Sequence, residues 1–426
     1  MPAVPRPAAS PIGYLTDCYP ATSHTFVQRE VLGLRALGVD VHTFSTHRAG
    51  PEHVLSQDDR DAFATTFALL PVSVRALLGG HARALADAPR AYLRAAAFAL
   101  ALGRGAKGRL WQLFYFAEAV LLWRQCAARG IRHVHAHFTR PAADAALLAA
   151  HLGTLADDGA PWTWSFSAHG ADIYDTDPVA LAAKVRDARF VVCVSHYGRA
   201  ELMKLVAEEH WPKLRVVRCG IDLTRYAPAH DRAARGASPL RILTVGRLVA
   251  VKGQTVLLEA LARLVATGVD AQLTIVGDGP LRAELEAAAG RLGVGGRVRF
   301  AGRVGQDDLL AYYEAADVFV LTSLAEGIPV VLMEAMATGL PVVASDITGI
   351  PELVGDGEEG LLVPAGDAGG FAAALETLAL DPGRRARMGQ QGRRRVESEY
   401  EVRRSAVDLR RVMREFGALP LPGPAA

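Results

Sequence analysis

Short apolar runs alternate with amphipathic stretches of helix length along nearly the whole chain. This alternation is typical of a parallel sheet covered by helices. In the first half, one of the helices is expected at Phe26–Leu37, and six runs are predicted as strands: Ile12–Thr16, Val39–Phe44, His133–Phe138, Trp164–Ala168, Phe190–Val194 and Leu214–Arg218. We therefore expect an α/β fold whose first domain, residues 1–228, is a Rossmann-like, doubly wound sheet.

The same alternation restarts after Pro228–Pro239, a segment rich in alanine, arginine, histidine and proline that resembles a linker. Five further strands are predicted there: Arg241–Val245, Gln272–Val276, Val298–Ala301, Val318–Thr322 and Pro341–Ser345. A second Rossmann-like domain is thus expected from residue 229. Ligands of open α/β sheets bind at the carboxyl ends of the strands, so two such domains facing a central cleft would place functional loops there.

Composition sets the class of protein. A chain of 426 residues that is 50% hydrophobic can bury two cores of ordinary size. The net charge of +2 and the lack of a zinc-finger or RNA-binding signature argue against nucleic acid as a partner. Because the cations are 42 arginines and only five lysines, a lysine inside a loop motif, such as Lys252, stands out.

The cysteines and the hydrophobic segments point to a cytoplasmic location. Cys18, Cys126, Cys193 and Cys219 form no Cys-x-x-Cys pair, and Met1–Ser10 lacks the apolar core of a signal peptide. The most hydrophobic window, residues 110–123, is interrupted by Gln112 and Glu118 and is shorter than the roughly 20 residues of a spanning helix. It is predicted to be a buried or interfacial helix.

The most informative motif contains two carboxylates, Glu326 and Glu334, with seven residues between them. A strand and its loop run into a helix there, and Pro329 is predicted as the first helical position. The backbone amides near that helix N-terminus, which can hold anionic or hydroxyl oxygens, belong to Gly327, Ile328 and Val330. One carboxylate in the loop and one inside the helix could accept hydrogen bonds from two parts of an extended sugar ligand. The alternative is an ordinary loop glutamate and a solvated glutamate on the helix.

A second motif runs from Gly246-Arg247 to Lys252-Gly253, after a strand and before a helix. An arginine fork and a lysine point charge close to helical amides suit a diphosphate and would offset its charge as it leaves. Two solvated cations in an ordinary loop are the alternative, and a Walker loop is absent.

Another glycine-containing loop, Gly277-Asp278-Gly279-Pro280, also ends a strand. The third glycine of a dinucleotide fingerprint is replaced by Arg282, so a dehydrogenase is disfavoured and a simple turn is favoured.

Histidines carry the candidate chemistry of the first half. His133, His135 and His137 alternate along a strand and so share one face, a spacing that could build a zinc site. We favour no metal, since no carboxylate or cysteine is visibly placed to complete the shell. His169 stands at the tip of a predicted strand before Gly170, where it could hydrogen-bond a sugar hydroxyl, accept a proton, or simply belong to the core.

Taken in order, these motifs resemble family 4 of the retaining glycosyltransferases, which have the GT-B fold. The resemblance covers residues 12 to 416 and includes Ala335–Val343 and Gly349-Ile350-Pro351-Glu352 after the paired glutamates. It implies that residues 229–395 bind a nucleotide-sugar donor, that residues 1–228 bind the acceptor, and that residues 396–426 form a helix returning to the first domain plus a loose tail.

The resemblance also assigns roles to single residues. It implies that Arg247 and Lys252 bind the donor diphosphate, that Glu326 contacts the transferred sugar and that Glu334 holds the ribose. It places the nucleotide base near Arg303 and Val304, and His169 near the reacting carbon; the remaining donor-side residues are Gly246, Asp278, Gly327, Ile328, Pro329 and Val330. It further implies retention of the anomeric configuration, with no cofactor and no essential metal.

The segment from Cys18 to Val27, followed by Glu30, looks like the branch that builds exopolysaccharides of the colanic acid or amylovoran type, as does His135-Ala136-His137-Phe138. Members there often have glutamate where this chain has His24. The acceptor-side residues implied are Ser23, Thr25 and His137. The expected reaction is transfer of a hexose from a UDP-sugar, with GDP-mannose as the alternative donor, to a saccharide or lipid-linked acceptor. A nucleotide-sugar epimerase and a non-catalytic sugar-nucleotide-binding scaffold are the competing functions.

A basic, apolar stretch adds a possible partner. Next to the hydrophobic run 110–123, a single acid, Asp87, accompanies six cations: Arg83, Arg90, Arg94, Arg104, Lys107 and Arg109. Such a surface suits peripheral contact with the anionic cytoplasmic face of the inner membrane and a lipid-linked acceptor. Ordinary helices with solvated arginines are the alternative.

Overall fold

A computed structural model describes residues 10–22, 24–227 and 239–421. The chain forms two compact units: residues 1–217 together with 405–426, and residues 218–404. The sequence placed its boundaries at 228/229 and 395/396. The predicted linker lies almost wholly outside the described residues.

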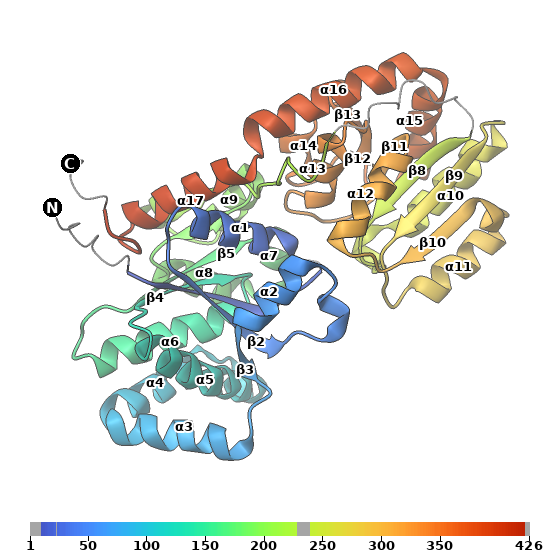
Figure 1. The fold of residues 1–426 in the computed structure, drawn as a ribbon. Helices are drawn as coiled ribbons and strands as arrows, with labels where there is room; N and C mark the ends of the chain where they lie inside the picture. Colours follow the sequence, from blue (N-terminus) through green and yellow to red (C-terminus); the bar gives the residue numbers. More distant parts are fainter. Residues whose placement is uncertain (1–9, 23, 228–238, 422–426) are drawn as a thin grey trace. The chain divides into compact units, whose positions relative to one another are not determined.

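The first unit is built on a parallel sheet of seven strands in the order β3-β2-β1-β4-β5-β6-β7 (Figure 1). The strands are β1 (Ile12–Tyr19), β2 (Val41–Arg48), β3 (Phe67–Leu70), β4 (His133–His137), β5 (Thr163–Ala168), β6 (Val191–Cys193) and β7 (Leu214–Val216). The helices are α1 (Thr25–Ala36), α2 (Gln57–Thr65), α3 (Val74–Asp87), α4 (Pro89–Leu102), α5 (Gly105–Ala127), α6 (Ala142–Ala156), α7 (Ala171–Asp175), α8 (Pro178–Asp187) and α9 (His196–Met203).

The second unit repeats the plan with six parallel strands in the order β10-β9-β8-β11-β12-β13. Its strands are β8 (Leu240–Val245), β9 (Ala271–Val276), β10 (Val298–Gly302), β11 (Val318–Leu321), β12 (Val342–Ser345) and β13 (Gly360–Val363). Its helices are α10 (Gln254–Ala266), α11 (Arg282–Arg291), α12 (Gln306–Ala315), α13 (Val330–Ala337), α14 (Ile350–Leu353), α15 (Ala368–Leu380) and α16 (Pro382–Glu399).

The α/β class and the predicted strands are confirmed, while β3 and β13 were missed. Both are edge strands of four residues. Both are apolar runs, and a run of four residues cannot be told from a piece of helix by periodicity alone.

The last helix, α17 (Val402–Glu415), belongs to the first unit from Ser405 onward. Leu409, Val412 and Met413 are buried in one apolar cluster with Ile12 and Tyr14 of β1. A spacing of three and four residues puts these side chains on one face of the helix, which explains why an arginine-rich segment still docks.

No helix within the described residues is long and apolar enough to cross a membrane. The hydrophobic window forms part of α5, whose second half is buried at Phe116, Val120 and Trp123. Its first half exposes large apolar side chains, with Leu110, Trp111 and Phe114 each more than half exposed. The predicted helix is confirmed, and its second half is buried; an interfacial position stays a prediction.

Candidate functional site

In the second unit, the loops that follow β8 and β9 pack backbone against backbone. Gly277 has φ +132°, and a Cβ atom there would lie 1.9 Å from the carbonyl oxygen of Gly246. A Cβ on Gly279 would lie 2.4 Å from the carbonyl oxygen of Leu248, whose amide donates to the carbonyl of Asp278 at 3.1 Å. Only glycine fits such an approach, so these glycines build the floor of the site.

The turn that carries Lys252 is fastened to the end of β11. Gly253 adopts the left-handed conformation at φ +61°, and a Cβ there would lie 2.2 Å from the carbonyl oxygen of Thr322. The Thr322 hydroxyl donates to the Gly253 carbonyl at 2.9 Å, and the Leu324 amide donates to the Val251 carbonyl at 2.7 Å. Two loops far apart in sequence are thus held together.

This fastening brings together the two motifs that the sequence singled out. The Nζ atom of Lys252 lies 2.5 Å from Oε1 of Glu326, and the Ser323 hydroxyl donates to the same oxygen at 2.6 Å. The Glu326 side chain is 10% exposed and the Lys252 side chain 26%. A partly buried ion pair therefore stands beside the start of α13, where backbone amides have no partner within the helix.

Glu334 lies deeper in the same helix. Its residue is 1% exposed, and Tyr313 donates its hydroxyl to Oε2 at 2.8 Å. The prediction that Pro329 is the first helical residue was wrong by one position. Pro329 is the N-cap, with an extended ψ of 121°, and the helix begins at Val330. The amides of Gly327 and Ile328 precede this cap, as expected.

The other donor-side residues lie in the loops that follow β8, β9 and β10. Arg247 is exposed, and its side chain has no hydrogen bond or ion pair among the described residues, while its carbonyl accepts from Gln254 at 2.8 Å. Arg303 is exposed in the loop after β10, and Val304 packs against the apolar cluster. Asp278 accepts a hydrogen bond from the amide of Gly279 at 2.9 Å, which matches the simple turn favoured for this loop.

In the first unit, the three histidines of β4 share one face of the sheet with serines of β5. Ser165 Oγ lies 2.9 Å from Nε2 of His133 and 2.7 Å from Nδ1 of His135, and Nε2 of His135 lies 2.9 Å from Ser167 Oγ. Burial lowers the pKa of His133 to about 3 and holds the pKa of His135 well below its usual range. These rings are therefore neutral, and each offers one donor and one acceptor.

His169 directly follows β5, and Gly170 after it has φ +105°. Its Nε2 lies 3.0 Å from Nδ1 of His137, and its backbone amide donates to Asp172 at 2.8 Å. Burial, followed by the neighbouring His137 and His24, holds the pKa of His169 well below the usual value. A neutral ring at the strand tip favours hydrogen bonding to a hydroxyl over proton uptake.

Sequence reasoning noted Glu30 in a motif but gave it no role. Its Oε1 lies 3.3 Å from Nε2 of His137 and accepts the hydroxyl of Tyr14 at 2.8 Å. A carboxylate distant in the sequence therefore does lie beside these histidines, although none was visible from the sequence alone. Potential ligand atoms of Glu30, His135 and His137 all lie within 4.8 Å of one another. The i, i+4 spacing from Phe26 to Glu30 places both on one face of α1 and is the signal that the sequence contains, whereas the contact of Phe26 with His169 is visible only in the structure.

Of the acceptor-side residues, Thr25 is the first residue of α1 and is buried, and His137 is buried under Tyr14. Ser23 lies outside the described residues. His24, at the N-cap of α1, packs its ring against Phe138 with the centroids 4.7 Å apart. The carboxyl ends of β4 and β5 thus carry a cluster of aromatic and imidazole rings.

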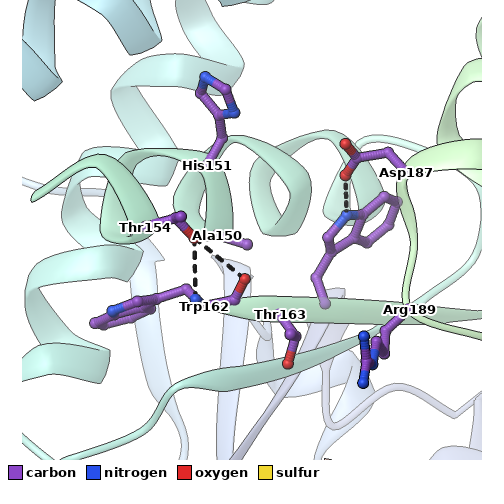
Figure 2. Close-up of a pocket in the computed structure, with 8 residues that line it drawn as sticks. Ala150, His151, Thr154, Trp162, Thr163, Asp187 and Arg189 are labelled. Atoms are coloured by element: carbon purple, nitrogen blue, oxygen red, sulfur yellow. Dashed lines mark hydrogen bonds between the residues drawn. The ribbon is translucent and has the colours of Figure 1, made fainter. Parts of the chain in front are cut away.

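A cavity of about 240 Å³ in the first unit lies away from these residues (Figure 2). Figure 2 shows Thr154 hydrogen-bonded to the backbone of Trp162. In the same lining the indole of Trp164 donates to Asp187 at 2.6 Å. Thr163, also in its lining, begins β5, so the cavity lies at the amino end of that strand and His169 at the other. Because ligands of parallel sheets bind at the carboxyl ends, we do not assign this cavity to the candidate site.

Comparison with known proteins agrees with this geometry. Residues 230–395 match the family model "Glycosyl transferases group 1". The GDP-mannose-dependent alpha-(1-6)-phosphatidylinositol monomannoside mannosyltransferase of Mycolicibacterium smegmatis is 34% identical over 264 residues, which are 57% of this chain and 67% of that enzyme. The amylovoran biosynthesis glycosyltransferase AmsK of Erwinia amylovora is 39% identical over 194 residues, 44% of this chain and 47% of that protein.

Among solved structures, Anabaena HepE in complex with UDP-glucose superposes with a TM-score of 0.71 at 17% identity, covering 95% of this chain and 99% of that one. The family model matches residues of the second unit, whereas this structural likeness covers both units and identifies the GT-B fold. With two parallel-sheet units, the paired glutamates at a helix start and a relative matched over two thirds of its length, the chain belongs to the group 1 glycosyltransferases.

Proposed function

We propose that this protein is a retaining glycosyltransferase that moves a hexose from a UDP-sugar to a saccharide or lipid-linked acceptor in cell-surface polysaccharide synthesis. The observation that carries the proposal is the Lys252–Glu326 pair, 2.5 Å apart, beside the start of α13. Arg247 supplies a second cation in the same loop. AmsK, from amylovoran biosynthesis, supports the acceptor class, and HepE, solved with UDP-glucose, supports the uridine donor.

In the proposed reaction, the bond between the sugar C1 and the phosphate oxygen breaks, and its electron pair goes to the departing diphosphate. The acceptor oxygen bonds to C1 on the same face, and the acceptor proton passes to the departing phosphate oxygen. No side chain acts as nucleophile. Lys252, Arg247 and the amides at the start of α13 stabilise the charge that grows on the diphosphate.

The Lys252–Glu326 contact gives both residues a defined task. Glu326 holds the Lys252 ammonium beside the N-terminus of α13, and the Ser323 hydroxyl donates to Glu326. The cation is therefore preorganised. A diphosphate would share this ammonium, which leaves Glu326 oxygens to accept sugar hydroxyls. Glu334, oriented by Tyr313 one helical turn deeper, is placed to accept from ribose hydroxyls.

Two measurements test the donor and the stereochemistry. A thermal-shift series with UDP, GDP and ADP at equal concentration should show the largest rise in Tm with UDP, because a ligand bound only by the folded state stabilises it more the lower its Kd. A larger rise with GDP would assign a GDP-sugar such as GDP-mannose instead. The anomeric signal of the product, followed by NMR, should match the donor configuration; an inverted product would refute retention, and an isomerised donor without any acceptor would indicate an epimerase.

We also propose that helices α3 to α5 contact an anionic membrane surface. Apolar side chains exposed on α3 and α5 include Val74, Leu78, Leu110, Trp111 and Phe114. Six cations on α3 to α5 are exposed and have no ion pair among the described residues: Arg75, Arg83, Arg90, Arg94, Lys107 and Arg109. Asp87, the acid of this stretch, is engaged by Arg124 at 3.1 Å. Apolar anchors beside unpaired cations are the combination that binds anionic lipid.

Flotation with vesicles tests this contact. The protein should float with phosphatidylglycerol vesicles at low salt and much less at high salt or with phosphatidylcholine. The pair Lys107→Glu and Arg109→Glu should abolish flotation, whereas Arg387→Glu with Arg394→Glu on α16, the same change in charge, should not. Failure to bind at low salt, or equal loss in both variants, would refute the proposal.

A further inference from the structure

A carboxylate and two imidazoles form a continuous chain from α1 to the tip of β5. Glu30 Oε1 lies 3.3 Å from His137 Nε2, and His137 Nδ1 lies 3.0 Å from His169 Nε2. The His137 side chain is 0% exposed and that of Glu30 17%, while His169 is partly exposed. The contact of His137 Nε2 with Glu30 falls outside strict hydrogen-bond geometry, yet the separation is short and no other partner for this buried atom is present among the described residues.

The directions of the hydrogen bonds follow from what each group can do. An ionised carboxylate only accepts, so the atom of His137 that faces Glu30 carries the proton. In a neutral His137 ring Nδ1 then accepts, and the proton between the two histidines belongs to Nε2 of His169. Since His169 is neutral, its Nδ1 keeps a lone pair. No hydrogen-bond partner for that Nδ1 is found in the part of the chain that the structure describes.

We propose that Glu30 and His137 are positioning residues that fix His169 in the Nε2–H tautomer, so that its Nδ1 presents a hydrogen-bond acceptor to a hydroxyl of the bound sugar. This inference rests on the proposed function only for the identity of that hydroxyl. Glu30 is itself held by the Tyr14 hydroxyl at 2.8 Å. The rings of Phe26 and Phe138, with centroids 4.5 and 4.9 Å from His169, limit how the imidazole can turn.

A metal ion held by Glu30, His135 and His137 is the competing explanation of the cluster. Both ring nitrogens of His135 already lie within 2.9 Å of serine hydroxyls, so an ion would have to displace one of those contacts. The proposed chain keeps both serine contacts of His135 and requires only that Glu30 and His137 align more closely than their 3.3 Å contact shows. It therefore accounts for the geometry more fully than a metal site does.

Two variants of similar size separate the roles of Glu30. Glu30→Gln can keep an oxygen acceptor facing His137, whereas Glu30→Met removes it. We expect Glu30→Met to lower kcat by about 10- to 100-fold, the range typical of removing a group that orients a metal-binding histidine. Glu30→Gln should stay within a few-fold of the parent, and the Tm shift produced by UDP should be the same in both. Tyr92→Phe, which removes a phenol hydroxyl that lies 2.9 Å from His81 Nδ1 and far from this chain in the fold, is the control and should keep the activity.

The tautomer gives a readout that does not depend on catalysis. Imidazole ¹⁵N NMR, assigned with His169→Gln, should show His169 protonated at Nε2 in the parent and in Glu30→Gln, and a mixture of tautomers in Glu30→Met. An unchanged tautomer in a folded Glu30→Met, equal loss of kcat in both Glu30 variants, or stoichiometric metal in the purified protein would overturn the inference. Absence of transferase activity in the parent would refute the proposed function and leave the tautomer result interpretable.

Discussion

The loop cluster of the second unit and the histidine face of the first unit solve different physical problems. The loop cluster holds charges, Lys252 and Glu326, beside a helix start and on glycine-rich backbone. The histidine face holds neutral rings on a buried strand, satisfied by hydroxyls of the next strand. Charge is kept where amides and solvent can stabilise it, and neutral polar groups are kept where burial would penalise charge.

This difference suggests that the two regions bind chemically different parts of the substrates. The charged cluster suits the group whose charge changes most in the reaction, the diphosphate. The neutral face suits hydroxyls, which need orientation and no charge. Each region can be tested with substitutions that leave the other intact, because the two belong to separate compact units.

The largest expected effect is on the charged cluster. Lys252→Ala should lower kcat by about 10²- to 10³-fold, the usual result of removing one preorganised donor from a site of charge development. Lys204→Ala, which removes an exposed lysine paired with Glu201, is the control and should leave kcat unchanged. Steady-state kinetics together with Tm would check this. Unchanged turnover in a folded Lys252→Ala would remove the phosphate role.

Backbone packing beneath the charges should give the next effect. Gly277→Ala combines a left-handed φ with a Cβ 1.9 Å from the Gly246 carbonyl, whereas Gly268→Ala has φ +93° and no atom within 4 Å. Gly268→Ala should cost about 1–3 kcal/mol of unfolding free energy from backbone strain alone. Gly277→Ala should cost clearly more and should also weaken the UDP-induced Tm shift. Equal losses in denaturant unfolding would show that the close approach of the two loops is unimportant.

The neutral histidine face predicts a smaller, pH-dependent effect. The pKa of His133 is about 3 in the folded protein, against roughly 6.5 when unfolded. Below pH 6.5 the unfolded chain binds the extra proton, so the contribution of His133 to stability is complete above pH 6.5 and is lost as the pH falls toward 3. The loss is about 1.4 kcal/mol per pH unit.

His133→Gln removes that titration. The unfolding free energy of the parent should therefore decline more steeply than that of the variant between pH 6 and pH 4, measured by denaturant unfolding at each pH. The two proteins should show parallel pH dependence above pH 7. Parallel slopes throughout would mean that His133 is not kept neutral by burial.

Much of the fold could be predicted because its signals are local. Buried parallel strands such as β8 and β11 are short apolar runs, and Pro239 and Gly246 mark the ends of β8. The edge strands β3 and β13 are apolar runs of the same kind, but only four residues long, and they were missed. The start of α13 was misplaced by one residue, because proline is compatible with both the N-cap and the first helical position and only its ψ distinguishes them.

The sequence by itself determined the two α/β units and the donor-side motifs. Each motif, Gly246 to Gly253 and Glu326 to Glu334, runs from the end of one strand into the helix that follows, so its residues are neighbours along the chain. Only the tertiary structure brought Lys252 onto Glu326 and joined Glu30, His137 and His169 into one chain. Those contacts join residues from different elements, and their partners are chosen by strand order and helix packing. A pattern along the chain shows which residues can do chemistry, whereas the packing of distant elements decides which of them meet.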